Sequence, residues 1–310
     1  MKVTVIGGGV IGYTCAHELA RAGHDVTVLA ADPPDRTTSA VAAAVWFPYE
    51  AAPADAVLRW GARSLRAFTE LAADPGTGVS LRSGLVLHRT ASPDLWWTAA
   101  VASAETVLDG LPHGVPSATR CTLPVIDMGR YLPWLVAAAG VRTVVGEVRD
   151  LADVEGAVVV AAGLRSGGLL ADEDVTPVRG QVVRLANPGL TDWLIDDDNP
   201  AGLTYVVPRD HDVVCGGTAE RGAWSVDPSP GVETAILTRV RDLVPALRAA
   251  LVASRGVGLR PARSAVRLDR VERDGRPVVS CYGHGGAGVT LSWGCAAEVV
   301  ALLGRDGGPV

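Results

Sequence analysis

The first thirty residues constrain the fold of this chain more than any other stretch. Residues 3–6 are a short β-branched run without breakers, typical of a buried strand. Gly7, Gly9 and Gly12 follow in a G-x-G-x-x-G spacing, an apolar helical face comes next, and residues 25–29 predict a second strand. Strand, glycine turn, helix and strand together are the context in which such glycines bind a dinucleotide.

Each glycine has a separate physical task in such a turn. Gly7 permits the tight turn, Gly9 lets the backbone approach a pyrophosphate, and Gly12 lets the helix pack closely on the strand. The phosphates then meet free N–H groups at the positive end of the helix, where Val10 and Ile11 stand. The alternative, a glycine-rich turn that binds nothing, is disfavoured by the flanking strand and helix.

Composition narrows the class of protein. The chain has 310 residues, 48% of them hydrophobic and 20% charged, so a sizeable core in one large or two interleaved domains is expected. A net charge of −6 without a basic stripe argues against nucleic acid. Five scattered cysteines without metal-site spacing indicate buried thiols, no metal and a reducing, cytoplasmic location. No segment reads as a signal peptide or as long enough to span a bilayer, so no membrane partner is expected.

The order of the expected elements indicates an α/β fold in two interleaved parts. Strands alternate with helices near both ends of the chain and around residues 127–160, whereas short strands separated by turns follow residue 179. We expect a discontinuous Rossmann-like cofactor-binding domain and a second, mainly antiparallel β-rich substrate domain. The segments expected for the first domain are 1–50, 125–180 and 256–310, and those for the second are 51–124 and 181–255.

Several local predictions accompany this outline. They are a loop at 31–40, helices at 55–73, 127–140 and 228–251, a strand pair at 79–89 with an exposed His88 near its end, and an irregular stretch at 94–123.

Residues after the second strand could contact a cofactor. Asp32 lies about 20 residues past the glycines, where an acid can hydrogen-bond a ribose. Thr37 and Thr38 add hydroxyl groups suited to phosphate, although an ordinary solvated turn has the same composition. The small residues Ala43, Ala44 and Val45 would let a large flat molecule lie against the backbone.

A second glycine-rich turn stands near the C-terminus. Gly285, Gly286 and Gly288 leave backbone N–H groups bunched at the N-terminus of the last expected helix. That cradle suits the electron-rich edge of a flavin ring. Two glycine turns at opposite ends of the chain could thus hold one long cofactor, although a glycine-rich helix entry alone would be ordinary.

Residues 278–296 carry a dense motif. Two aliphatic and two polar residues precede Tyr-Gly, then come small residues, a glycine and, after five residues, G-x-A. This pattern resembles the signature of the D-amino-acid oxidase family, except that Ser280 and Cys281 stand where the family usually has His followed by Asn, His or Ala. The glycine turn and the stretches 37–49, 178–185, 204–208, 216–218 and 258–263 also match, so the resemblance spans residues 1–304.

The resemblance implies a substrate site. Arg260 is similar to the arginine that holds the substrate carboxylate, and Tyr205 to the tyrosine whose hydroxyl also meets it. Tyr49 resembles an aromatic wall of the pocket, and Gly286 the glycine whose carbonyl receives the amine.

The resemblance also implies non-covalent FAD as the cofactor. Thr37 and Thr38 match the family's phosphate-binding pair, Val148 resembles the residue beside the adenine, and the family's ribose-binding acid falls on Ala31, one residue before Asp32. The residues expected to bind FAD are Gly7, Gly9, Val10, Ile11, Gly12, Asp32, Thr37, Thr38, Ala43, Ala44, Val45, Val148, Gly163, Arg260, Gly285, Gly286, Ala287, Gly288, Val289 and Thr290.

The activity implied is FAD-dependent oxidative deamination of D-amino acids, with dioxygen as acceptor and a 2-oxo acid, ammonia and hydrogen peroxide as products. Ala219 stands where D-aspartate oxidases tend to have an arginine, which favours neutral substrates. Ala201 replaces a lid tyrosine, so bulky side chains are expected to be accepted. The alternatives are a D-aspartate or glycine/sarcosine-type oxidase and a non-catalytic flavin- or NADPH-binding protein. A homodimer is left open.

Overall fold

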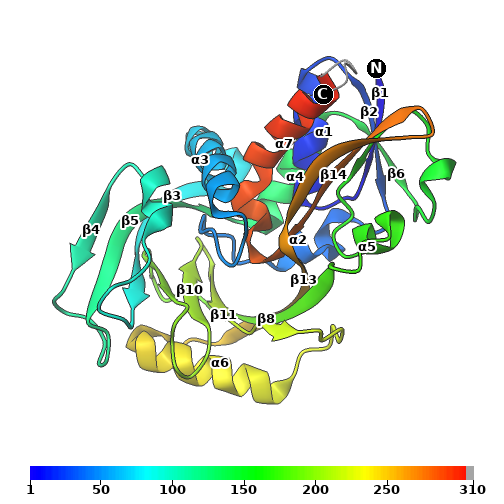
Figure 1. Cartoon of the computed structure of the whole chain (residues 1–310). Helices are drawn as coiled ribbons and strands as arrows, with labels where there is room; N and C mark the ends of the chain where they lie inside the picture. The colour runs from blue at the N-terminus through cyan, green and yellow to red at the C-terminus, as the bar shows by residue number, and fades with distance from the viewer. Residues whose placement is uncertain (305–310) are drawn as a thin grey trace.

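The strands of this protein join into one long mixed sheet (Figure 1). The computed structural model describes residues 1–304, so the last six residues of the expected segment 256–310 lie outside it. Within residues 1–304 the sheet has fourteen strands, in the order β4-β5-β3-β9-β10-β11-β8-β13-β14-β7-β1-β2-β6, with β12 beside β8. Helices pack on this sheet, which gives the mixed α/β fold expected from the sequence.

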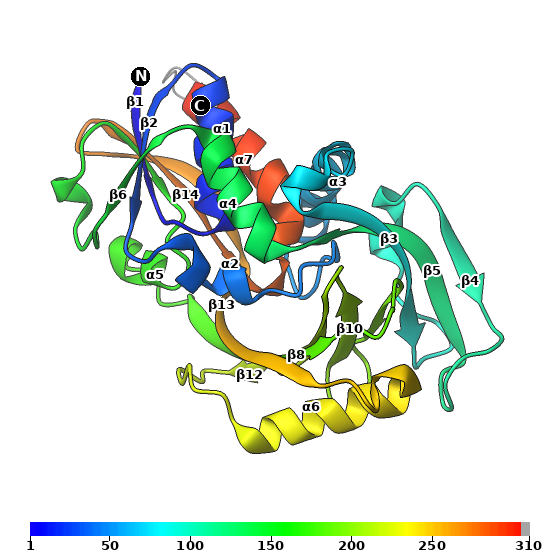
Figure 2. The ribbon, with the colours of Figure 1, turned by 180° about the vertical axis from the view of Figure 1, so that it is seen from behind.

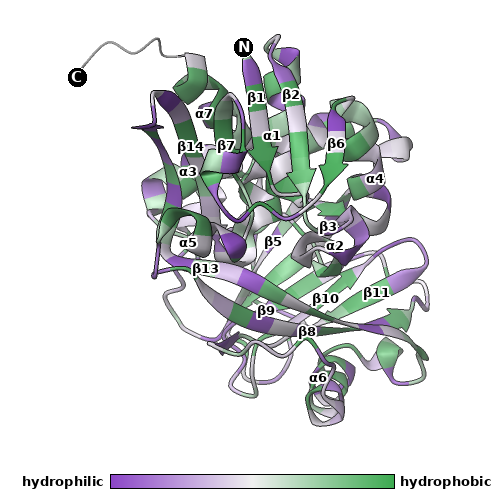
Figure 3. Ribbon diagram, turned by 90° about the vertical axis from the view of Figure 1, so that its right-hand side faces the viewer, coloured by the Kyte–Doolittle hydropathy of each residue, from purple (hydrophilic) through white to green (hydrophobic). Residues whose placement is uncertain are grey.

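The N-terminal glycine turn belongs to a parallel part of the sheet. β1 pairs in parallel with β2 and β7, and β6 and β14 extend this part at its two ends. Three helices, α1, α4 and α7, lie on one face, and α5 packs on the other (Figures 2 and 3). The elements are β1 (Lys2–Ile6), α1 (Val10–Arg21), β2 (Asp25–Ala30), α4 (Met128–Ala139), β6 (Arg142–Val145), β7 (Ala157–Val160), α5 (Arg165–Leu170), β14 (Arg276–His284) and α7 (Gly288–Gly304).

The remaining strands form the mainly antiparallel part. All of their pairings except β3 with β9 are antiparallel, and α6 covers the outer face of β8, β10 and β11 (Figure 1). The strands are β3 (Val79–His88), β4 (Ala104–Val107), β5 (Ser117–Ile126), β8 (Thr176–Ala186), β9 (Trp193–Asp196), β10 (Thr204–Pro208), β11 (Asp212–Gly216) and β12 (Glu220–Arg221). The helices beside them are α2 (Thr38–Val41), α3 (Ala54–Leu71) and α6 (Pro230–Leu243).

One long strand joins the two parts. β13 (Val252–Arg273) pairs with β8 through Ala262 and with β14 at Ala262 and again from Arg267, with an irregularity between these two residues. A bulge of this kind bends a strand and redirects its side chains. Arg260 stands just before this bend, where the parallel and antiparallel parts meet.

The structure corrects two predictions about strands. Residues 79–89 do not form a strand pair: β3 is one strand, and Gly84 sits in its middle because a Cβ there would lie 2.1 Å from the Trp193 ring. The stretch at 94–123 is not irregular throughout, since it contains β4 and most of β5, which pair with each other and with β3. Its prolines and glycines fall between these strands rather than within their paired centres.

Three smaller corrections concern individual segments. His88 is buried rather than exposed, and its Nε2 lies 2.8 Å from the Thr119 hydroxyl on the paired strand β5. The expected loop at 31–40 contains a short 3-10 turn and the start of α2. The expected helix at 228–251 ends as α6 at Leu243, before Pro245, because the residue preceding a proline disfavours helical backbone.

The helix α7 corrects the expectation that no segment is long enough to cross a membrane. Residues Gly285–Gly304 are long and apolar enough by length and composition alone. Most of this stretch is buried, and Gly294 permits α3 to pack against it, since a Cβ there would lie 2.2 Å from the Trp60 carbonyl oxygen. Packing between α1 and α3 therefore accounts for the apolar character of this helix.

Candidate active site

The glycine turn has the geometry that its spacing predicts. Gly7 has φ +129°, a region that favours glycine, and a Cβ on it would lie 2.2 Å from the Ala161 carbonyl oxygen. A Cβ on Gly12 would lie 1.9 Å from the Gly7 carbonyl oxygen, so only glycine lets α1 approach the turn this closely. The N-terminus of α1 therefore meets the carboxyl ends of β1 and β7 without side chains between them.

A cavity of roughly 680 Å³ starts at this turn and reaches strands β10 and β13. It brings together almost all of the predicted site residues. Those that line it are Gly7, Gly9, Val10, Ile11, Asp32, Thr37, Thr38, Ala43, Ala44, Val45, Tyr49, Val148, Gly163, Tyr205, Arg260, Gly285, Gly286, Gly288 and Val289. Sequence positions more than two hundred residues apart therefore share one wall.

Three predicted cofactor residues do not line this cavity, and each has a supporting place instead. Gly12 lies where α1 packs against the glycine turn. Ala287 is fully buried in the core. The Thr290 hydroxyl donates to the Phe47 carbonyl at 2.9 Å and accepts from the Phe47 N–H at 3.1 Å, which fixes the segment before Tyr49 against α7.

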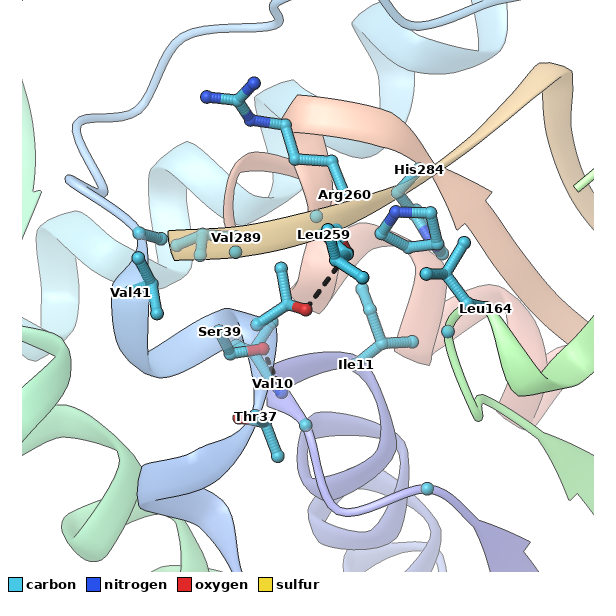
Figure 4. A pocket seen from close by; sticks show the side chains of 18 of the residues that line it. Val10, Ile11, Thr37, Ser39, Val41, Leu164, Leu259, Arg260, His284 and Val289 are labelled. Atoms are coloured by element: carbon cyan, nitrogen blue, oxygen red, sulfur yellow. Dashed lines mark hydrogen bonds between the residues drawn. The ribbon is translucent and has the colours of Figure 1, made fainter. Parts of the chain in front are cut away.

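The hydroxyl groups after β2 join distant segments near the turn (Figure 4). Ser39 accepts a hydrogen bond from the Val10 N–H at 3.0 Å, next to the start of α1. Thr38 donates to the Leu259 carbonyl at 3.0 Å, and Thr37 donates to the Pro34 carbonyl at 2.7 Å. Thr37 and Thr38 thus line the cavity, but their hydroxyl protons are already donated to backbone carbonyls of the protein. The Ser39 hydroxyl contacts the first residue of α1.

Asp32 has a partner that the sequence did not indicate. The Arg165 guanidinium lies 2.7 Å from its carboxylate, and both side chains are about half exposed. Arg165 also lines the cavity, as does Val148. A ribose and a base at this end would therefore meet an acid already oriented by an arginine.

Arg260 stands at the opposite end of the cavity from the glycine turn. In Figure 4 its side chain extends away from Val10 and Ser39, and it lies on the strand next to β8. One guanidinium nitrogen donates to the Thr218 carbonyl at 2.7 Å. A Cβ on Gly180 would lie 2.5 Å from another of its nitrogens, so this glycine makes room for the guanidinium.

Two tyrosines flank Arg260. Tyr205 packs on the backbone of Gly216, where a Cβ would lie 2.1 Å from the ring. Tyr49 packs on Gly286 in the same way, with a corresponding distance of 2.8 Å. Burial raises the pKa of Tyr205, and burial raises the pKa of Tyr49 to about 12, so both phenols keep their protons and can donate hydrogen bonds.

The sequence missed several residues of this wall. Ile195 and Leu203 line it near Tyr205, and Trp224, 63% exposed, lines it from the segment after β12. Asp197 lines it as well, from a run of three aspartates in which the sequence alone does not show which one faces inward. Strand alternation in Trp193–Asp196 was the available signal for Ile195, whereas Asp197 lies in the turn that follows this strand.

The structure also gathers three groups of ligand type that the cysteine spacing did not indicate. Cys281, His284 and Cys295 are buried, and their possible ligand atoms lie within 4.8 Å of one another. Burial raises the pKa of Cys295, and burial lowers the pKa of His284 to about 4, so the thiol stays protonated and the imidazole neutral.

A charged network holds the second glycine turn in place. Asp172 accepts hydrogen bonds from the Tyr282 hydroxyl at 2.8 Å, from Arg263 at 3.0 Å and from Arg267 at 3.1 Å. Burial acts to raise the pKa of this carboxyl, but these bonds outweigh it and lower the pKa to about 2. The network therefore ties the end of α5 to β13 and β14, directly behind Gly283 and Gly285.

The donors and the shape of the cavity fit FAD. One end offers the N-terminus of a helix beside a glycine turn, which suits a pyrophosphate. The middle is walled by the small residues 43–45, and the other end by Gly285 and Gly286, so a broad ring system finds backbone rather than side chains. The volume lies in the range typical of cofactor and ligand sites.

A dinucleotide turn, a long shared cavity and a guanidinium with two phenols at its far end define a nucleotide-cofactor oxidoreductase with a two-part α/β fold. Comparison with known proteins identifies which kind. A family profile described as FAD dependent oxidoreductase (DAO) matches residues 2–302, so the chain belongs to this family.

Relatives and solved structures agree with the family. A protein of Rubrobacter xylanophilus named D-amino-acid oxidase is 48% identical over 98% of this chain and 96% of its own length. One of the same name from Streptomyces coelicolor is 44% identical over 97% and 96%. The crystal structure of glycine oxidase from Geobacillus kaustophilus matches with a TM-score of 0.83 and 23% identity, over 99% of this chain and 95% of that one, which supports the fold.

Proposed function

We propose that this protein is an FAD-dependent D-amino-acid oxidase that converts D-amino acids and dioxygen into 2-oxo acids, ammonia and hydrogen peroxide. The observation that carries the proposal is the placement of Arg260 and Tyr205 in the wall of the same cavity as the N-terminal glycine turn. A protein that only bound a nucleotide would have no use for a partly buried guanidinium flanked by two protonated phenols at the far end of the site. The names of the relatives from Rubrobacter and Streptomyces support the same reaction.

The chain's own residues bind and orient the substrate. Arg260 lines the cavity, where one nitrogen donates to the Thr218 carbonyl and the side chain also hydrogen-bonds Tyr205. A guanidinium has five N–H donors, so others can fork onto a carboxylate. Tyr205 adds a hydroxyl donor beside it. Gly286 offers a backbone carbonyl for the amine, behind the Tyr49 ring.

Positioning supplies the catalysis in this arrangement. A substrate held by its carboxylate and amine has one fixed orientation of its Cα–H bond, and fixed orientation removes much of the entropic cost of reaction. When bound, FAD would supply the redox chemistry, that is, the capacity for two-electron oxidation of the substrate at Cα with dioxygen as the final acceptor. The protein needs no acid or base of its own at the reacting carbon, and the described cavity wall offers no lysine there.

Two alanines near the substrate end are relevant to the choice between a D-amino-acid oxidase for neutral substrates and a D-aspartate oxidase. Ala219, after the Gly216–Gly217–Thr218 stretch, brings no positive charge to the site and is exposed, so nothing at that position would hold a second carboxylate. Ala201 is exposed and does not line the cavity, and the acceptance of bulky substrates stays a prediction. The cytoplasmic location, the homodimer and the exact domain boundaries also stay predictions.

Anaerobic reduction of the purified protein tests this proposal. Yellow protein that is bleached by D-alanine but not by L-alanine, and recovers its colour with dioxygen as peroxide forms, is the expected result. Colourless protein that binds NADPH instead, or yellow protein bleached by neither enantiomer of several amino acids, would overturn it.

A further inference from the structure

Asp197 gives the cavity a second charge, opposite in sign to that of Arg260. β9 and β10 pair with Ile195 opposite Tyr205, so these two side chains share one face of the sheet, and both line the cavity. Asp197 follows the end of β9 at Asp196, in a turn, and it lines the same cavity together with Leu203. Its carboxylate thus belongs to the substrate end of the cavity and not to the phosphate end.

The neighbouring aspartates are used differently. Asp196 points to the opposite face, where it is fully buried and pairs with Arg89 while accepting from Asn199 at 2.9 Å. Asp198 is exposed and does not line the cavity. Among residues 1–304 no arginine, lysine or histidine forms an ion pair with Asp197. One carboxylate of the three is therefore left to face the cavity without a cationic partner.

Asp197 and Arg260 act with opposite sign on the same tyrosine. Beyond the effect of burial and of Glu50, Arg260 acts to lower the pKa of Tyr49 and Asp197 acts to raise it. Burial also raises the pKa of Asp197 itself, with repulsion from Asp198 and Asp196 adding to the effect. A half-buried carboxylate in this position gains more from a bound cation than one in water would.

The surroundings of Asp197 suit a cation on an aliphatic stem. Ile195, Leu203 and Phe47 line the same end of the cavity with apolar surface. Long basic side chains lay their methylene groups on such surface while their charged end meets a polar group. Trp224 and Val226 line the cavity as exposed side chains, so this end also borders solvent.

We propose that Asp197 is a specificity residue that makes D-amino acids with a cationic side chain, such as D-arginine and D-lysine, preferred substrates over their neutral analogues. This inference rests on the proposed function, since it assumes that Arg260 holds the α-carboxylate. Two opposite charges in the wall of one cavity, both close enough to act on Tyr49, then match the two ends of a basic D-amino acid. The same carboxylate repels an acidic side chain, in agreement with the absence of a cation at Ala219.

The test compares D-arginine with D-citrulline, which has the same length but a neutral side chain. We expect kcat/KM for D-arginine to be about tenfold higher or more, since one retained charge contact is worth a factor of that order. Asp197→Asn should bring this ratio close to one while kcat/KM for D-alanine changes less than about threefold. The same substitution should raise the ratio of D-glutamate to D-glutamine. Asp198→Asn, one residue away and outside the cavity, is the matched control and should change neither ratio.

Other outcomes overturn the inference. Equal kcat/KM values for D-arginine and D-citrulline in the unmodified enzyme would show that Asp197 does not discriminate between substrates by side-chain charge. A similar loss for D-arginine, D-citrulline and D-alanine in Asp197→Asn would assign the carboxylate to the α-amine or to the structure of the wall.

If no D-amino acid bleaches the flavin, the proposed function fails separately. The affinities of D-arginine and D-citrulline, measured from the flavin spectrum, then decide the role of Asp197. If Asp197→Asn loses its flavin, the ratio in the unmodified enzyme decides alone.

Discussion

Replacing Arg260 by methionine tests the substrate site most severely. One guanidinium nitrogen donates to the Thr218 carbonyl at 2.7 Å and the side chain also hydrogen-bonds Tyr205, while further N–H donors of the guanidinium can meet a carboxylate. Hydrogen bonds to charged groups contribute about 1.5–3 kcal/mol each, and the side chain is only partly buried, so we take about 2–4 kcal/mol for the forked contact. That loss corresponds to about 30- to 1000-fold in kcat/KM for D-alanine, mostly through KM.

The assay is steady-state peroxide production, with flavin content measured from absorbance on each preparation. Arg255→Met is the matched control, because Arg255 lies on the same strand but pairs with Glu233 outside the cavity. Arg260→Lys should recover part of the lost activity, since an ammonium keeps the charge but not the fork. Full flavin content with unchanged KM in Arg260→Met, or an equal loss in Arg255→Met, would refute the carboxylate role.

Further predictions concern other parts of the site. Tyr205→Phe should lower kcat/KM about 10- to 100-fold with flavin retained, because one hydrogen bond to a carboxylate is lost; a change below about twofold would contradict its role. Gly12→Ala should yield protein without flavin, since its Cβ would lie 1.9 Å from the Gly7 carbonyl oxygen; normal flavin content would refute this reading of the turn. The lowered pKa of Asp172, about 2, implies a stabilisation of about 2 kcal/mol that is complete above about pH 4 and lost as the pH falls toward 2. Denaturant unfolding of Asp172→Asn and the unmodified protein should therefore converge in acid, and a difference independent of pH would exclude this network.

The sequence predicted the parts of the fold that rest on local chemistry. The glycine turn, the helix that starts at Asp127 and ends at Gly140, and the antiparallel strands after residue 179 all formed as expected. Each depends on a pattern within about fifteen residues: a φ that favours glycine, a capping side chain or an alternation. The prediction for the segment 94–123 failed because β5 is stabilised by pairing with β3, and β4 by pairing with β5, which no local pattern records.

The predictions for the site divide in the same way, into features that local sequence indicates and features that depend on strand pairing. Arg260, Tyr205 and Tyr49 could be named from motifs, because a resemblance transfers positions. The glycines that make room for them, such as Gly180 beneath the guanidinium, depend on which strand lies beside which. Asp197 could not be predicted because it lies in the turn after β9, where no strand alternation indicates which of the three aspartates faces the cavity.

A crystal structure of the yellow protein with a bound carboxylate inhibitor such as benzoate tests the central claim most directly. We expect the pyrophosphate of FAD at the N-terminus of α1, and the inhibitor carboxylate on the Arg260 guanidinium and the Tyr205 hydroxyl. A carboxylate bound elsewhere, with Arg260 directed away from the flavin ring, would contradict the account.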